Sequence, residues 1–273
     1  MIRGLVLGAA LAVLAAAPAA ALPIVQAHRG LTFVDGTPTH AENTLPALQA
    51  AHARGFVVEL DTRAVQDGAI ALHDATLDRT TTCSGDAIDM TLAAVAACSS
   101  DTAGRPGSSL GFEARPGGPP PPNLADVLAW ARDSGARLNL ELNDDQDDRV
   151  ARVLDVVAAS GYPVRRLIVQ SFYSADLQTA RQRLPGVTLS TLALRAFNVG
   201  ALNAARNIGA RWVSPEWPIA RGYVRGVHRA RRKVVPHSPS TRRAIRQAKR
   251  IGVDAVITDD PVMARRELRR RRG

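Results

Sequence analysis

The chain has 273 residues, of which 46% are hydrophobic, and a net charge of +10 at pH 7. This length and composition suit one large globular domain or two small ones and argue against a disordered chain. Residues 221–273 hold 17 Lys or Arg against 4 Asp or Glu, and the other 18 basic and 21 acidic residues give −3. A basic end could bind nucleic acid or an anionic surface, but we expect no nucleic-acid partner, because hardly any aromatic residues lie between the arginines as stacking platforms.

Residues 1–22 have the pattern of a secretion signal. A basic residue near the start precedes the apolar run Leu5–Ala17, and Ala19–Ala21 offers a small-residue cleavage site. The alternative is an uncleaved membrane anchor. The first predicted strand begins at Ile24, however, so no spacer would separate an anchor from the fold. We expect a cleaved signal, a secreted or extracytoplasmic domain over residues 23–273, and no stable membrane insertion.

The first predicted strand, Ile24–Ala27, runs into the sequence His28-Arg29-Gly30. A polar loop follows, and Asn43 or Thr44 then caps a helix that ends near Gly55. The second predicted strand, residues 56–61, is apolar and β-branched except for two carboxylates.

Those carboxylates, Glu59 and Asp61, share one face of the strand, because side chains two residues apart point the same way. Two acids on a buried strand are unfavourable without a compensating charge, and a cation is the simplest compensation. The pair Asp67-Gly68 then predicts a tight hairpin turn. The returning strand ends at His73, so the hairpin brings an imidazole back toward the carboxylates.

Residues 75–122 interrupt this order and predict an insertion from one end of the domain. They include a Gly/Pro-rich run from residue 104 and the only two cysteines, Cys83 and Cys98. A bond between the cysteines would suit an exported protein and would stabilise the fold by roughly 3 kcal/mol, less any strain. Two buried free thiols are the alternative, and we favour the bond.

A helix is predicted from Asn123 to Ser134, and strands and helices alternate after it. The predicted strands are Arg137–Glu141, Leu167–Ser171, Val187–Leu194, Arg211–Pro215, Lys233–His237 and Ala255–Thr258. The predicted helices between them are Asp147–Ala159, Ser174–Leu184, Ala201–Ile208, Gly222–Arg232 and Thr241–Ile251. With the first two strands this makes eight, each but the last followed by a helix. The pattern predicts an α/β fold, a closed (β/α)8 TIM barrel. An open doubly wound sheet is the alternative, but no glycine-rich dinucleotide loop follows any strand.

In such a barrel, functional side chains lie where the strands end. Glu141 follows the third strand on the same face as Asn139 and Asn143, and it joins Glu59 and Asp61 at one mouth. Three carboxylates make an oxygen-rich site for a hard divalent cation, Mg²⁺ or Ca²⁺. Zinc would require more histidine or cysteine.

Two histidines, His28 and His73, flank this predicted cation site. Imidazoles titrate near neutral pH, so one can act as a base and the other as an acid. The guanidinium of Arg29 suits a planar clamp on phosphate. A cation, an arginine and two imidazoles together indicate phosphodiester cleavage, in which charge develops on phosphate oxygens.

The motifs in this order resemble the glycerophosphodiester phosphodiesterase family. They are His28-Arg29-Gly30, Glu42-Asn43-Thr44, Glu59-x-Asp61, Asp67-Gly68, His73-Asp74, Glu141-Leu142 and Thr258-Asp259-x-Pro261. The resemblance implies a barrel with an insertion near the second strand. It also implies hydrolysis of a small-molecule glycerophosphodiester to glycerol 3-phosphate and an alcohol with a divalent metal. By resemblance the metal ligands are Glu59, Asp61 and Glu141, the acid–base pair is His28 and His73, and Arg29 holds the phosphate.

The chain departs from that family's pattern at two places. The family usually has lysine where this chain has Asn143, and it often has Trp-Thr where this chain has Pro236-His237. Both places lie near the expected substrate, so Asn143 and His237 are candidate substrate-binding residues. Trp217 is a third, because it comes late enough after its strand to line the mouth. Without the positive charge of that lysine, phosphate binding could be weaker or the preferred substrate could differ.

Two other functions compete with this interpretation. One is a related barrel acting on lysolipid or sphingolipid headgroups, similar to spider-venom phospholipase D enzymes. Such an enzyme needs apolar loops at its mouth, and residues 104–122 offer only Leu110 and Phe112 as sizeable apolar side chains. The other is a binding protein that uses its basic end on anionic polymers. The sequence predicts no particular oligomeric state.

Overall fold

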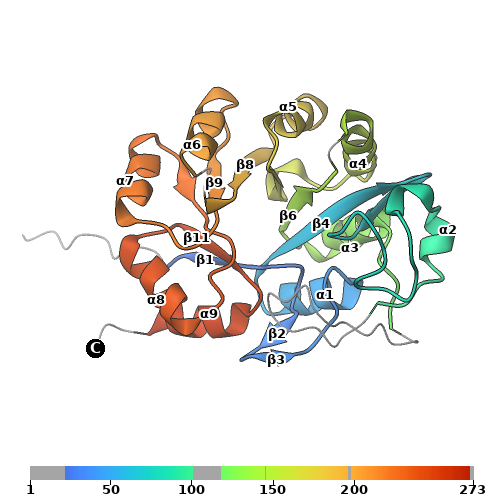
Figure 1. The fold of residues 1–273 in the computed structure, drawn as a ribbon, viewed down its shortest axis with the longest axis horizontal. Helices are drawn as coiled ribbons and strands as arrows, with labels where there is room; N and C mark the ends of the chain where they lie inside the picture. The colour runs from blue at the N-terminus through green and yellow to red at the C-terminus, as the bar shows by residue number, and fades with distance from the viewer. Residues whose placement is uncertain (1–21, 101–117, 145, 196–197, 271–273) are drawn as a thin grey trace, which may run out of the picture.

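Eight parallel strands form the wall of a barrel, and helices surround them (Figure 1). The computed structural model of the protein describes residues 22–100, 118–144, 146–195 and 198–270. The predicted secretion signal up to residue 21 and most of the Gly/Pro-rich run lie outside the described residues.

The elements alternate along the chain as the sequence predicts. The described strands are β1 (Ile24–Ala27), β2 (Phe33–Val34), β3 (Thr37–Pro38), β4 (Val57–Val65), β5 (Gly68–Ala71), β6 (Leu138–Leu142), β7 (Leu167–Ser171), β8 (Thr188–Ala193), β9 (Trp212–Pro215), β10 (Lys233–Val234) and β11 (Ala255–Thr258). The described α-helices are α1 (Leu45–Ala53), α2 (Leu92–Val95), α3 (Leu124–Ser134), α4 (Asp147–Ala159), α5 (Ser174–Arg183), α6 (Asn198–Asn207), α7 (Arg221–Arg229), α8 (Arg242–Ile251) and α9 (Pro261–Arg269). The described residues also form two short 3₁₀ turns, η1 (Ala87–Asp89) and η2 (Val164–Arg166).

The strand order β10-β9-β8-β7-β6-β4-β1-β11 gives a parallel sheet that curls until its two ends meet. His237 pairs with Ile257 of β11 in a parallel bridge, and the Ser238 N–H donates to the Ile257 carbonyl at 3.0 Å. The predicted (β/α)8 TIM barrel is therefore confirmed. β10 is shorter than predicted because Pro215 of β9 has no N–H to donate to it, although the Val235 and His237 N–H groups still donate to β9 at 2.9 and 3.1 Å.

Alternation along the strands separates an apolar layer from a polar interior. Val58 and Leu60 of β4 lie in the core between sheet and helices, whereas Glu59 and Asp61 lie on the opposite face, inside the barrel. In β6 the Asn139 side chain donates at 2.8 Å to one glutamine of β1 and one of β7, across the inside of the barrel. The polar interior is thus bonded within itself, and it continues toward the strand ends.

The β4–β5 hairpin is confirmed, with Val65 opposite Gly68 across the turn. Residues 75–100 pack against it around a small apolar cluster to which both segments contribute, and α2 lies in this region (Figure 1). The predicted bond between Cys83 and Cys98 is present, with a Cα–Cα distance of 5.5 Å. It fastens the end of α2 to the loop that follows His73.

Three predictions about elements were wrong. A helix, α9, follows the last strand, where none was predicted; Asp260 caps it by accepting from the Met263 N–H, and Pro261 opens it. The loop before α1 contains the short β2–β3 hairpin. Helix α6 begins at Asn198 rather than residue 201, because its first turn has the weak helix-forming sequence Asn-Val-Gly.

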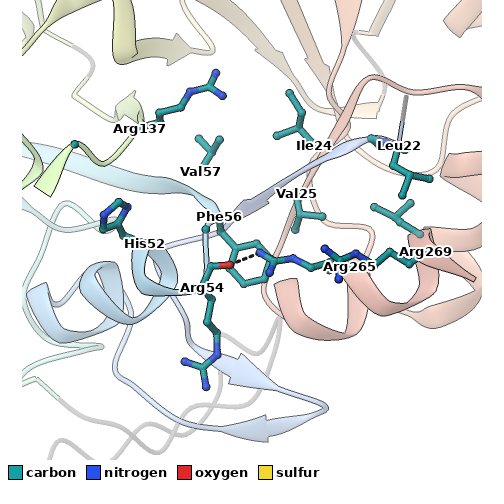
Figure 2. A pocket seen from close by; sticks show the side chains of 14 residues that line it. Leu22, Ile24, Val25, His52, Arg54, Phe56, Val57, Arg137, Arg265 and Arg269 are labelled. Atoms are coloured by element: carbon teal, nitrogen blue, oxygen red, sulfur yellow. Dashed lines mark hydrogen bonds between the residues drawn. The ribbon is translucent and has the colours of Figure 1, made fainter. Parts of the chain in front are cut away.

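The amino end of the barrel holds a separate pocket of about 590 Å³ (Figure 2). Arg265 crosses it, 3.6 Å from the ring centre of Phe56, and donates to the Arg54 carbonyl at 2.6 Å. This pocket lies at the opposite end of the strands from the predicted catalytic side chains. None of the described helices is both long and apolar enough to cross a membrane.

Candidate active site

The carboxyl ends of the strands enclose a cavity of about 200 Å³. The residues that line it are His28, Arg29, Glu59, Asp61, His73, Glu141, Gln170, Phe172, Leu192, His237, Ser238 and Ile257. Seven of the nine candidate residues therefore meet in one place, and Asn143 and Trp217 lie outside this lining.

The turn after β1 holds the first two of these residues in a constrained backbone. Arg29 and Gly30 both have positive φ, 57° and 91°. A Cβ at Gly30 would lie 2.7 Å from the backbone of Ala47, so only glycine lets the turn approach α1 this closely. The Arg29 N–H donates to Glu59 Oε2 at 2.8 Å, which ties the turn to the next strand.

Glu59, Asp61 and Glu141, here called the carboxylate triad, each place an oxygen within 4.8 Å of the others. The parallel register of β4 and β6 sets Asp61 directly opposite Glu141. Burial raises the pKa of Glu59 well above its usual range, and the charges of Asp61 and Glu141 raise it further. For Glu141, burial and the charge of Asp61 raise the pKa to about 8.

A divalent cation fits this donor set. Three buried carboxylates that oppose each other's ionisation need positive charge, and carboxylate oxygens are the ligands that Mg²⁺ and Ca²⁺ take. Burial also raises the pKa of Asp61, but Arg29 and the two imidazoles lower it by more, so its net shift is downward. Asp61 is thus the member of the triad held ionised by the protein itself.

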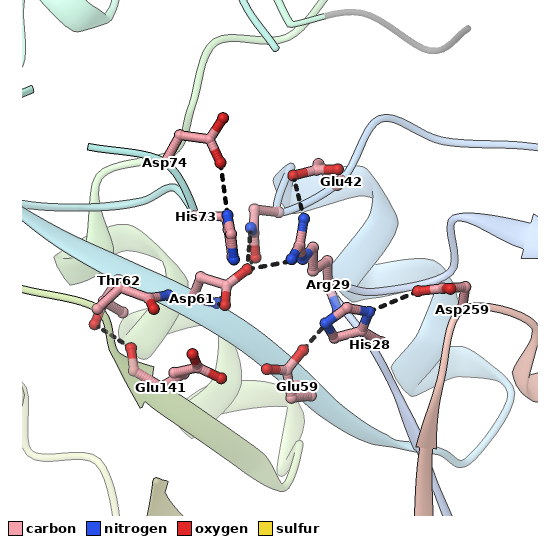
Figure 3. A network of polar contacts seen from close by, with 12 residues as sticks. His28, Arg29, Glu42, Glu59, Asp61, Thr62, His73, Asp74, Glu141 and Asp259 are labelled. Carbon is pink, nitrogen blue, oxygen red and sulfur yellow. Dashed lines mark hydrogen bonds and ion pairs between the residues drawn. The ribbon is translucent and has the colours of Figure 1, made fainter. Parts of the chain in front are cut away.

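Each candidate catalytic histidine has a carboxylate in contact with its Nδ1 (Figure 3). His28 Nδ1 lies 2.6 Å from Asp259 Oδ1, and His73 Nδ1 lies 2.6 Å from Asp74 Oδ1. A carboxylate at Nδ1 favours a proton on that nitrogen and leaves Nε2 free to accept or donate one. Such an arrangement suits general acid–base chemistry at Nε2.

Arg29 is held by the protein's own acids. Its Nη1 donates to Glu42 Oε1 at 2.8 Å, and its Nε lies 3.0 Å from Asp61 Oδ2 as an ion pair outside hydrogen-bond geometry. Burial lowers the pKa of Arg29, but the surrounding carboxylates, with Asp61 first, raise it by more. The predicted role of Arg29 in holding phosphate stays a prediction, and the side chain already orients Asp61.

Glu42 accepts from a second arginine, Arg79, as well as from Arg29. Arg79 donates to Glu42 Oε1 at 2.7 Å and to Asp74 Oδ2 at 2.5 Å. The four residues Arg29, Glu42, Arg79 and Asp74 form a continuous chain of ion pairs, here called the ion chain, that ends at the His73 imidazole. Figure 3 shows its two end links, Arg29–Glu42 and Asp74–His73. Sequence reasoning missed Arg79, because it lies in the insertion among residues that form no motif.

Three amides hold the carboxylate triad in place. Gln170 of β7 donates to Glu59 Oε1 at 3.1 Å and to Glu141 Oε2 at 2.9 Å. Asn43 and Asn143 each donate to Asp61, at 2.8 and 2.9 Å. Sequence reasoning missed Gln170 as a site residue, although its place on an inward-facing strand position was a usable signal. The predicted contact of Asn143 with substrate stays a prediction.

The two remaining candidates differ in position. His237 lines the cavity, and its Nε2 lies 3.2 Å from the Ala193 carbonyl. Burial lowers the pKa of His237, and the charge of His28 lowers it further, which favours the neutral imidazole. Trp217 packs half-buried against the main core. Their substrate contacts stay predictions.

Comparisons with known proteins agree with this geometry. The model of the glycerophosphoryl diester phosphodiesterase family matches residues 28–263. A glycerophosphodiester phosphodiesterase of Bacillus altitudinis is 25% identical over 247 residues, covering 86% of this chain and 94% of the relative.

Solved structures show the same fold. A phosphodiesterase of Oleispira antarctica, in complex with its product sn-glycerol-3-phosphate, has a TM-score of 0.76 and 20% identity, covering 90% of this chain and 97% of the other. A glycerophosphodiester phosphodiesterase of Agrobacterium tumefaciens has a TM-score of 0.68 and 23% identity, covering 89% and 99%.

Proposed function

The chain belongs to the glycerophosphoryl diester phosphodiesterase family, and from this premise we propose that it hydrolyses glycerophosphodiesters to glycerol 3-phosphate and an alcohol. We propose Mg²⁺ or Ca²⁺ as its cofactor. One observation carries the proposal: His28 and His73, each backed by a carboxylate, line the same cavity as the carboxylate triad. The product found on the Oleispira antarctica relative supports the choice of substrate.

The carboxylate triad would hold the cation, and Gln170 would keep two of its oxygens oriented. When bound, a divalent cation stabilises negative charge that develops on phosphate oxygens. The protein itself excludes water from the triad, whose three side chains are almost fully buried. Arg29 keeps Asp61 ionised and contributes positive charge at the edge of the cavity.

The two histidines would move the protons. The glycerol hydroxyl beside the phosphodiester can act as the internal nucleophile, and one imidazole Nε2 takes its proton. The other Nε2 gives a proton to the leaving alcohol, and a cyclic phosphate is the intermediate. Water then attacks this cyclic phosphate and breaks the bond to the glycerol oxygen that had attacked, with the two imidazoles in reversed roles, which gives glycerol 3-phosphate. Asp259 and Asp74 orient the rings so that both Nε2 atoms are available.

Release of glycerol 3-phosphate from a panel of glycerophosphodiesters, with and without EDTA, tests this function. We expect turnover that EDTA abolishes, and a bell-shaped pH profile. His28→Ala and His73→Ala should each lower kcat by about 10²–10⁴ and leave cation binding intact. A p-nitrophenyl diester, whose leaving group needs no proton, should rescue only the variant that lost the acid. Activity unaffected by either substitution would contradict the acid–base assignment.

We also propose that residues 1–22 are a signal peptide and that the enzyme acts outside the cytoplasm. The basic start, apolar run and small-residue site support this, and a disulfide between Cys83 and Cys98 is compatible with an oxidising compartment. Mass spectrometry of the protein recovered from the culture medium should give a first residue near Leu22. A chain that keeps residue 1 would contradict cleavage.

A further inference from the structure

An apolar patch lies beside the candidate active site. Within the described residues, five large apolar side chains are exposed, and four of them form this patch: Phe172 (43% exposed), Tyr173 (56%), Leu194 (52%) and Val199 (71%). They follow β7 and β8 and open α6, at the same end of the barrel as the catalytic cavity. Exposed apolar side chains that gather in one place mark a binding surface.

A pocket of about 530 Å³ is lined by Phe172, Tyr173 and Leu194, and Val199 directly precedes Gly200, another lining residue. Among the described residues no charged one lines it; the lining is Ser171, Phe172, Tyr173, Ser174, Leu177, Thr191, Leu192, Ala193, Leu194, Gly200, Ala201 and Ala204. Phe172 and Leu192 also line the catalytic cavity, so the two spaces share a wall. The Phe172 ring is held edge-on against His237, 6.4 Å between ring centres.

The lining of this pocket suits an apolar occupant. A charged or strongly polar group would find no charged partner among the described residues of this lining. Because Phe172 and Leu192 border both spaces, the pocket and the catalytic cavity are adjacent, and a molecule that passes over these two side chains would reach both. Such a molecule has a phosphodiester at one end and a hydrocarbon chain at the other.

We propose that this pocket takes the single acyl chain of a lysophospholipid-type glycerophosphodiester, so that the enzyme prefers acylated substrates to deacylated ones. The inference rests on the proposed phosphodiesterase function and names its substrate class. The apolar side chains come from the loops after β7 and β8, not from the insertion where sequence reasoning looked for them.

The test compares kcat/KM for glycerophosphocholine and for its 1-octanoyl ester, both as monomers below any micelle concentration. We expect the wild-type enzyme to favour the acylated substrate by about tenfold or more, the range in which apolar pockets discriminate. Gly200→Phe should remove this preference and leave hydrolysis of glycerophosphocholine unchanged. A Cβ at Gly200 meets no atom within 4 Å and its φ is not positive, so the ring can enter the pocket without backbone strain.

Gly222→Phe is the matched control, because Gly222 is also an exposed glycine in the first turn of a helix, with no atom within 4 Å of an added Cβ. It should keep the wild-type preference. Leu194→Ser is a second variant at an exposed position; it removes part of the apolar wall without adding volume and should lower the preference severalfold.

The outcomes separate this inference from the proposed function. Hydrolysis of glycerophosphocholine with no preference for the octanoyl ester, or a preference that survives in Gly200→Phe and Leu194→Ser, would overturn the acyl pocket alone. Hydrolysis of neither substrate by the wild type would overturn both. Binding to neutral phosphatidylcholine vesicles without a preference for the monomeric ester would assign the patch to a bilayer surface. Dimers that Gly200→Phe disrupts, again without that preference, would assign it to a second copy of the chain.

Discussion

Replacing Asp259 by asparagine tests how the protein prepares His28 for proton transfer. Asp259 Oδ1 lies 2.6 Å from His28 Nδ1. Burial raises the pKa of Asp259, but the charge and hydrogen bond of His28 lower it by more, so the group is a carboxylate at neutral pH. The substitution would keep the size of the side chain and remove its charge.

The loss can be estimated from this one contact. A hydrogen bond to a charged group contributes about 1.5–3 kcal/mol. If the imidazolium loses that stabilisation in the transition state, kcat falls by about 10- to 150-fold, at roughly 1.4 kcal/mol per factor of ten. An asparagine that turns its NH₂ toward Nδ1 would also force the ring proton onto Nε2. That tautomer cannot accept a proton, so a basic role for His28 predicts a larger loss, on the order of 10⁴.

The assay is kcat across the pH range for the wild type, Asp259→Asn and Asp254→Asn. The control is matched, because Asp254 Oδ2 lies 2.8 Å from His228 Nε2 in a histidine–aspartate pair that does not line the cavity. Asp254→Asn should keep kcat and the pH profile. An Asp259→Asn enzyme with wild-type kcat, or an equal loss in both variants, would refute the positioning role of Asp259.

Three further outcomes follow from the site and the insertion. Glu59→Gln should abolish the rise in Tm that Mg²⁺ or Ca²⁺ causes and reduce activity to background, and a cation-dependent Tm in this variant would contradict its role as a ligand. In the cation-free protein the folded pKa of Glu141, about 8, exceeds its ordinary value of 4.5, so the stability from its protonated form is present below 4.5 and is lost as pH rises toward 8. The cation-dependent rise in Tm should therefore grow between about pH 6 and 8, and a flat response would exclude proton release from this group. Cys83→Ser with Cys98→Ser should lower the free energy of unfolding in urea by roughly 3 kcal/mol while the folded enzyme keeps its activity, whereas unchanged stability would show that the bond adds nothing.

Local spacing made much of the site predictable. Glu59 and Asp61 share a face because a strand has a period of two, and the Asp67-Gly68 turn returns His73 next to them. Glu141 joins them because parallel strands end at the same edge of the barrel. Each step needed only a few neighbouring residues and one rule of geometry.

The partners of these residues were not predictable in the same way. Asp259 is 231 positions from His28, and Gln170 is 111 positions from Glu59, so only the closed barrel brings each pair together. The apolar patch also joins side chains from two loops, and neither loop is unusually apolar by itself. A sequence pattern shows where strands end, but the packing of eight strands decides which ends touch.

The charges at the mouth explain why a cation would matter for binding as well as for turnover. Asp61 of the carboxylate triad is ionised, and the two arginines of the ion chain are already paired with its two acids. The position where the resembling family usually has lysine holds Asn143, whose amide contacts Asp61. A phosphodiester is an anion, so it would approach a mouth with little unpaired positive charge of its own. Removing the cation should therefore weaken substrate binding together with kcat, because the same charge that stabilises the transition state must first offset the triad.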